Sequence, residues 1–135
     1  MGNRAVILTD KSTNEDQIGV YLHWNGGRDS VEAFLKYCKL KGYRSPETDS
    51  YGWARFCQVV GNFFGGDTSI GLDICARLDC DNWDNGVYII KGWEIVGREF
   101  FADTEQNHHD LHAMLTDINN AMPEKERISL PETIA

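Results

Sequence analysis

The spacing at which apolar residues recur changes twice along this chain of 135 residues, from strand-like to helical and back. The order of these changes limits the folds that the chain can adopt. Residues 4–9 and 18–24 are rich in β-branched and aromatic side chains, which is typical of strands, and the polar residues between them predict the loop of a hairpin. Helical spacing then takes over. From Ser69 apolar and polar residues alternate again, so strands stand on both sides of a helical region.

Three helices are predicted from apolar residues that recur every three or four positions. Gly42 follows the first helix as a stop signal, a pair of glycines ends the second, and Pro123 ends the third. The predicted helices span about residues 30–41, 51–64 and 111–122.

The second group of strands is predicted over residues 69–78, 87–91 and 93–101. In the first of these, Ile70, Leu72 and Ile74 alternate with polar or small residues, which predicts one buried face and one wet face. The resulting order is β-β-α-α-β-β-β-α. We therefore expect an α+β fold with a mainly antiparallel sheet of about five strands and three helices packed on it.

Length and charge limit the domain organisation and the partners. A chain of 135 residues is long enough for one substantial core, and we assign residues 1–123 to a single α+β domain and 124–135 to a mobile charged tail. The formal net charge of -8 opposes direct binding to nucleic acid, because neutralising phosphates requires clustered Lys and Arg. A partner with a basic surface is electrostatically favoured.

The chain has no apolar run of about 20 residues, which a membrane helix requires, and its first residues lack the pattern of a signal peptide. We expect a cytoplasmic protein without membrane contact. Its four cysteines form no CxxC pair, and Cys38 and Cys57 fall on the apolar faces of predicted helices. Buried free thiols are expected in that compartment.

The stretch NGGRDS at 25–30 leads from a strand into a helix and leaves two interpretations open. Gly26 and Gly27 permit a tight turn, and Asp29 followed by Glu32 fits a helix cap in which the carboxylate accepts backbone N–H bonds. We favour this interpretation. The alternative is a phosphate or nucleotide site at the helix start.

The same stretch also resembles the SGGxDS signature of PP-loop ATP pyrophosphatases. That resemblance implies pyrophosphate contacts at Gly26, Gly27, Asp29 and Ser30, and the small-ligand alternative uses Gly26, Gly27, Arg28 and Ser30. The similarity departs from the signature at Asn25, and the repeated strand–helix units of that family's parallel sheet do not follow.

Histidines offer weaker candidates for chemistry. His108 and His112 lie one helical turn apart, a spacing that can ligate zinc, but the sequence shows no third ligand. A small hydrolase using His23 or this pair is a further alternative, although no local signature joins a nucleophile, a base and an acid. We predict no catalytic residue, metal or cofactor.

The acidic loop DCDNWDNG at 79–86 surrounds one large aromatic residue with carboxylates. Asn85-Gly86 predicts a turn, and the alternate oxygen ligands of a calcium loop are missing because Trp83 takes one of their positions. Asp79, Asp81, Trp83 and Asp84 form our candidate partner-binding site. Either Trp83 is a hot spot for a basic protein surface, or it folds back over the core.

Several segments, among them YLHWNGGRDSVEAFLKYC and YGWARFCQVVGNFFGG, are similar to small uncharacterised proteins of bacteria and their phages. The resemblance implies a cytosolic origin and brings no activity or catalytic residue. It suggests, by analogy, a phage or mobile-element inhibitor that binds a host protein. The sequence thus favours a non-enzymatic acidic binding protein, with a phosphate-ligand binder and a small hydrolase as alternatives.

Overall fold

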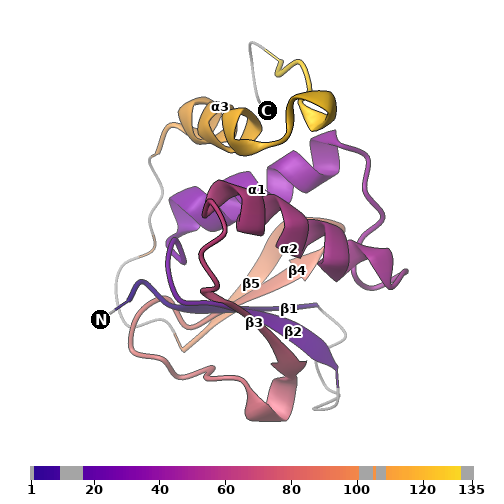
Figure 1. Cartoon of the computed structure of the whole chain (residues 1–135). Helices are drawn as coiled ribbons and strands as arrows, with labels where there is room; N and C mark the ends of the chain where they lie inside the picture. Colours follow the sequence, from indigo (N-terminus) through magenta and orange to yellow (C-terminus); the bar gives the residue numbers. More distant parts are fainter. Residues whose placement is uncertain (1, 10–16, 101–104, 106–108, 132–135) are drawn as a thin grey trace.

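All three helices lie on one side of a five-stranded sheet (Figure 1). The computed structural model describes residues 2–9, 17–100, 105 and 109–131. Its strands are β1 (Ala5–Thr9), β2 (Ile18–Leu22), β3 (Ile70–Ile74), β4 (Val87–Lys91) and β5 (Glu94–Glu99). Its α-helices are α1 (Arg28–Leu40), α2 (Tyr51–Phe63) and α3 (Leu111–Ala121), and two 3-10 turns are η1 (Cys75–Arg77) and η2 (Glu124–Glu126).

The strands are arranged in the order β3-β2-β1-β4-β5. Three of the four pairings are antiparallel, and β1 and β4 run parallel with Val6 opposite Val87. The parallel pair arises because the chain passes through α1, α2 and β3 before it returns beside β1. The predicted α+β class and its mainly antiparallel sheet are confirmed.

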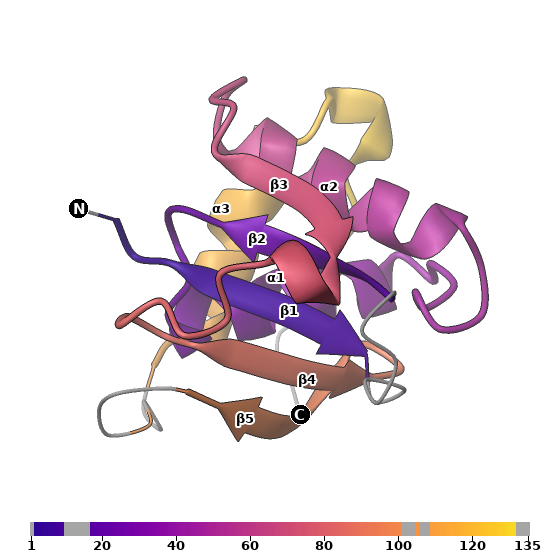
Figure 2. The same cartoon turned by 90° about the horizontal axis from the view of Figure 1, so that it is seen from below.

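Alternation along the strands divides the apolar side chains between the two faces of the sheet. Ile7, Val20 and Tyr88 point toward the helices and join the main core with aromatic residues of α1 and α2. Val6, Leu8 and Val87 point the other way and form a smaller cluster. The segment that begins with η1 covers this second cluster, as Figure 2 shows from below.

The helices form two further layers, with α3 lying across α1 and α2 on the side away from the sheet (Figure 1). The Tyr37 hydroxyl of α1 donates to Asn119 Oδ1 of α3 at 2.7 Å. The Asn119 side chain also donates to Ile128 O at 2.8 Å and accepts from Ile128 N at 3.0 Å. The packed domain therefore extends past Pro123 to Leu130, which lies against the core and beyond the boundary expected from the sequence.

The start of α1 differs from the prediction. The helix begins at Arg28, and its N-cap is Gly27, which offers no side-chain hydrogen bond. Asp29 lies inside the first turn, where its carboxylate accepts from the adjacent Ser30 N at 2.8 Å. Asp29 is therefore not the N-cap, although an acidic group in the first turn still favours the helix dipole.

The strand expected over 69–78 is also shorter than predicted. It ends at Ile74, and Cys75–Arg77 turn into η1. Leu72, expected on a buried face, is 53% exposed. The reason is tertiary, because β3 is an edge strand and lies beside the helical layer rather than under its centre.

Candidate functional site

The segment 79–86, which we call the Trp83 loop, connects η1 to β4 and is attached to the start of β1. Arg4 Nε contacts Asp84 Oδ2 at 2.8 Å, and the Arg4 backbone N–H donates to the same oxygen at 3.0 Å. Asn85 N donates in turn to Arg4 O at 3.0 Å, and Val6 N donates to Gly86 O at 2.9 Å. The first residues of the chain thus hold both the side chain and the backbone of the loop.

Asn82 organises the loop from inside. This side chain is 1% exposed. Its amide nitrogen donates to Asp79 O at 3.0 Å and to Gly86 O at 3.2 Å, and its oxygen accepts from Asp84 N at 3.1 Å and from Gly86 N at 3.0 Å. Buried polar groups that are paired in this way fix one loop conformation, because any alternative leaves donors or acceptors unpaired.

Gly86 is required at the end of the loop for a steric reason. Its φ is +63°, and an added Cβ would lie 2.2 Å from Glu99 O. No side chain fits in that space. The turn predicted at Asn85-Gly86 is therefore present, and the neighbouring end of β5 explains why glycine occupies it.

Trp83 points away from the protein. Its side chain is 79% exposed, so it does not fold back over the core. Its φ is +64°, a left-handed conformation that costs a residue with a Cβ roughly 1–2 kcal/mol. Such a conformation persists only where the surrounding structure imposes it, and here Asn82 binds the backbone on both sides of Trp83.

The three carboxylates of the loop have different environments. Asp84 is held by Arg4, whose guanidinium and backbone N–H stabilise the ionised form and lower the pKa of the Asp84 carboxyl. Asp79 lies 3.7 Å from Arg4 Nη1 and is more exposed. Asp81 is exposed beside Asn82. Asp84 therefore supports the loop, whereas Asp79 and Asp81 are better placed to meet a partner.

Trp24, which was missed as a site candidate, lies with His23 at the same end of the sheet. Asn3 N donates to His23 O at 2.8 Å, and Asn85 Nδ2 donates to Asn3 Oδ1, so Asn3 joins the end of β2 to the Trp83 loop. Trp24 is exposed there and packs edge-on against the His23 ring. The sequence signal was the pair His23-Trp24 at the end of a strand, but nothing in the sequence placed it near residue 85.

The predicted phosphate residues take part in structural contacts. An added Cβ on Gly26 would lie 2.4 Å from Asn3 O, and Gly26 O accepts from the Tyr88 hydroxyl at 2.7 Å. Arg28 forms ion pairs with Glu32 at 3.0 Å and with Glu105 at 3.1 Å. Ser30 is buried and accepts from Asn25 Nδ2. The Arg28 guanidinium and the Ser30 hydroxyl, which a phosphate would contact, are thus engaged within the protein.

The two candidate histidines that the structure describes, His23 and His112, lie on different elements, after β2 and on α3. His108 lies outside the described residues, and His112 is exposed on α3. His23 Nδ1 lies 2.9 Å from the Tyr21 hydroxyl. In the part of the chain that the structure describes, no three histidine, cysteine or acidic side chains are grouped so that they could hold a metal ion.

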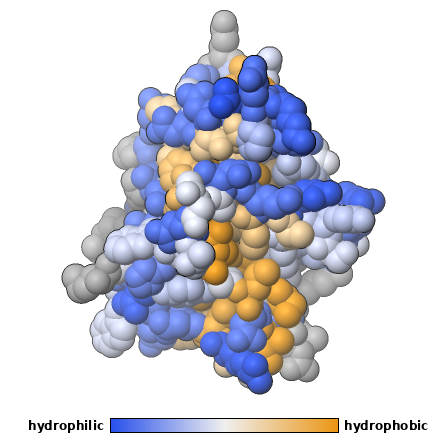
Figure 3. Space-filling view, viewed as in Figure 1, coloured by the Kyte–Doolittle hydropathy of each residue, from blue (hydrophilic) through white to orange (hydrophobic). Residues whose placement is uncertain are grey.

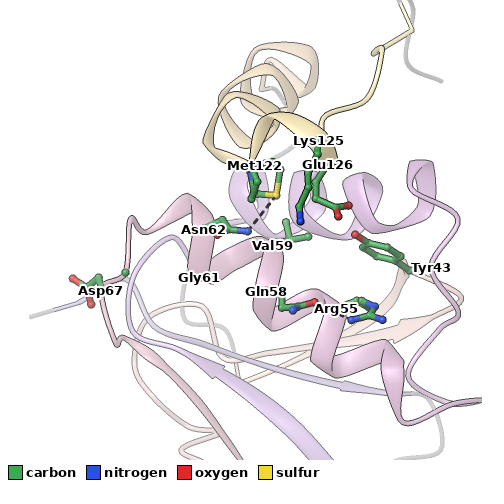
Figure 4. A pocket seen from close by; sticks show the side chains of 12 residues that line it. Tyr43, Arg55, Gln58, Val59, Gly61, Asn62, Asp67, Met122, Lys125 and Glu126 are labelled. Carbon is green, nitrogen blue, oxygen red and sulfur yellow. Dashed lines mark hydrogen bonds between the residues drawn. The ribbon is translucent and has the colours of Figure 1, made fainter.

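A hollow that the sequence did not indicate lies between α2 and the segment 122–126 (Figure 4). Its volume is about 810 Å³. Arg55 and Lys125 reach it from opposite walls, and Asp67 and Glu126 also line it, so its formal charges cancel. Asn62 Nδ2 contacts Met122 Sδ at 3.7 Å across the hollow. The residues that line the hollow are far apart in the sequence and form no motif. Because their charges cancel, the hollow favours neither an acidic nor a basic ligand.

Comparisons with protein-family models, with curated proteins and with solved structures found no match. Among the described helices, none combines the length and the apolar character needed to cross a membrane.

Proposed function

We propose that this protein is a non-enzymatic binding protein that docks the Trp83 loop on a basic surface of another protein. The observation that carries the proposal is the exposed Trp83, held at positive φ by a buried asparagine. A strained, solvent-facing tryptophan lowers stability without any gain in packing, and backbone strain of this kind is concentrated at functional sites. Tryptophan is also among the residues most enriched in binding hot spots.

Rigidity of the loop supports the same proposal. The contacts of Asn82 and Arg4 hold the Trp83 backbone in one conformation before a partner arrives. A preorganised loop loses little conformational entropy on binding, so more of the contact energy contributes to affinity.

The negative charge of the protein indicates that the partner surface is basic. The chain carries a formal net charge of -8, and the exposed Asp79 and Asp81 flank Trp83. Opposite charge on a partner raises the association rate and makes the complex sensitive to salt, since the field is screened within about 10 Å at 0.1 M. In this proposal the protein acts as an inhibitor by occupying its partner's basic surface.

Capture from a bacterial lysate by the immobilised protein tests the proposal. We expect Trp83→Ala to weaken the capture of a basic protein about thirtyfold or more, since a hot-spot residue contributes about 2 kcal/mol or more. Asp81→Asn is expected to reduce capture mainly at low salt. Val96→Ala, which truncates an exposed apolar side chain on β5, is the matched control and should not change capture. Equal capture by the Trp83 variant and the control would refute the assignment.

A further inference from the structure

The edge formed by β3 is the less protected of the two edges of the sheet. β5, at the other edge, carries Glu94, Arg98 and Glu99, and a bulge interrupts its pairing with β4 between Ile89 and Ile90. Charges and bulges of this kind hinder pairing with foreign strands. β3 reads Ile-Gly-Leu-Asp-Ile, and its pairing with β2 is regular over five residue pairs.

The backbone groups that β3 presents at its free edge follow from its bonds to β2. Ser69 O accepts from His23 N, and Cys75 N donates to Gln17 O. The backbone groups of Ser69 and Cys75, on either side of β3, therefore face β2. Backbone groups alternate in direction along an antiparallel strand. The N–H and C=O groups of Ile70, Leu72 and Ile74 therefore point to the free edge. The Ile74 N–H is covered by the Asp73 carboxylate at 2.7 Å. Among the described residues, nothing pairs with the edge-facing groups of Ile70 and Leu72, which are left for a partner.

Apolar side chains accompany these backbone groups. Leu72 is 53% exposed and Ile18, on the neighbouring strand, is 47% exposed. Figure 3 shows apolar side chains gathered in the lower part of the molecule, where Figure 1 places β3. An exposed apolar strip beside unpaired backbone groups is the feature that strand-adding peptides use.

A cleft beside the strip offers room for a side chain of an added strand. Its volume is about 720 Å³, and Leu72, Ile18, Trp53 and Pro46 contribute apolar walls. Gln17 also lines it, and its Nε2 atom is buried without a hydrogen-bond partner among the described residues. The Gln17 oxygen already accepts from Thr9 N at 3.2 Å, so the free group is the donor. An unpaired buried donor is unfavourable, so the wall of this cleft holds a polar group that the described contacts leave unpaired.

The charge around β3 selects the occupant. Asp67 precedes the strand, Asp73 lies within it, and the chain as a whole carries a formal charge of -8. A second copy would bring the same charge and the same carboxylates to the edge, whereas a basic segment would be attracted. We propose that the free edge of β3 binds an extended, basic segment of a partner protein with alternating apolar side chains, which extends the sheet by one strand. This surface is separate from the Trp83 loop.

A short synthetic peptide of alternating lysine and valine is the probe, and backbone hydrogen exchange measured by NMR is the readout. The Ile70 and Leu72 amides should exchange about tenfold more slowly or better when the peptide is added in excess. The same peptide with glutamate in place of lysine, and a version methylated on its backbone nitrogens, should give no such protection. Protection by the glutamate peptide equal to that by the lysine peptide would overturn the choice of a basic occupant.

Protein variants separate this site from the proposed function. Leu72→Lys should abolish the protection, whereas Val96→Lys, which changes a similarly exposed residue on the other edge strand, should leave it unchanged. Trp83→Ala should also leave it unchanged, because it affects only the proposed function. No protection in the unmodified protein, equal protection in the Leu72 variant, or a dimer of the chain alone that Leu72→Lys dissociates would each overturn the proposal.

Discussion

Arg4 and Asp84, separated by 80 positions in the sequence, meet in an ion pair with Nε and Oδ2 2.8 Å apart. The pair joins the segment leading into β1 to the Trp83 loop. Because Arg4 also donates its backbone N–H to the same carboxylate, Asp84 accepts two bonds from one residue. The acidic loop is thus attached to the sheet by one of its own acidic residues.

The Arg4–Asp84 pair predicts a dependence of stability on acid pH. Arg4 lowers the pKa of Asp84 below its ordinary value, so folding favours the ionised carboxylate. The resulting stabilisation is present above the ordinary pKa of about 3.9 and is lost as pH falls through the folded value. Asp84→Asn should therefore lose less stability than the unmodified protein between about pH 4 and pH 2. Urea unfolding across this range measures the free energy of unfolding of both proteins. An equal loss of stability in the two as pH falls would contradict the prediction.

Trp83→Gly should raise the free energy of unfolding by up to about 1 kcal/mol, because glycine adopts positive φ without the steric cost and the exposed indole contributes little packing. The same variant should bind the partner no better than Trp83→Ala. Thermal and urea unfolding measure the first effect. A lower stability for the glycine variant would show that the tryptophan stabilises the loop.

Asn82→Ala should lower the free energy of unfolding by about 2–3 kcal/mol, since it leaves buried carbonyl and amide groups of the loop unpaired. Asn120→Ala removes the same side chain from an exposed position of α3 and is the matched control, expected within about 0.5 kcal/mol of the unmodified protein. Urea unfolding compares the two. Equal stability of both variants would contradict the role given to Asn82.

Gly26→Ala and Gly61→Ala should have opposite effects on stability. An added methyl group at Gly26 would lie 2.4 Å from Asn3 O, which overpacks the site and costs about 1–3 kcal/mol. At Gly61, inside α2, the methyl group meets nothing within 4 Å, and the helix should gain about 0.5–1 kcal/mol. Thermal unfolding of both variants checks the sign. A stable Gly26 variant would reopen the ligand interpretation of the glycine loop.

Tyr37→Phe should flatten the loss of stability at alkaline pH. Burial raises the pKa of the Tyr37 hydroxyl from 10.0 to about 12, so the folded state keeps the proton that the unfolded state releases. This contribution is complete below pH 10 and is lost as pH rises toward 12. At neutral pH the variant should be about 1 kcal/mol less stable, since it loses the bond to Asn119. Urea unfolding at neutral pH tests the second effect, and urea unfolding between pH 10 and about pH 12 tests the first. A loss of stability in the alkaline range as steep as that of the unmodified protein would contradict the first effect.

Much of the fold was predictable because the spacing of apolar residues along a helix or strand indicates which side chains face the core. The helix and strand periods placed the three helices and five strands of the described residues, with errors of at most four residues at their ends. The misplaced Asp29 cap and the exposed Leu72 show where this reasoning ends. A cap depends on the backbone conformation of Gly27, and the exposure of a strand depends on its position in the sheet.

The candidate site was predictable only in composition. The acidic residues and Trp83 stand together in the sequence, but whether the indole faces solvent or the core was left open. Asn82 was missed because an asparagine in a loop is an ordinary turn residue. Its importance appears only when the carbonyl and amide groups of Asp79 and Gly86 converge on it.

The sequence by itself determined the elements, the α+β class and the acidic character, since these depend on periodicity and on the kinds of side chain present. Tertiary structure alone decided that Arg4 holds Asp84, that Trp83 faces solvent and that β3 has a free edge. Each of these three depends on which distant segments lie side by side. Such contacts are settled by the packing of the whole domain, because no local energy along the chain specifies them.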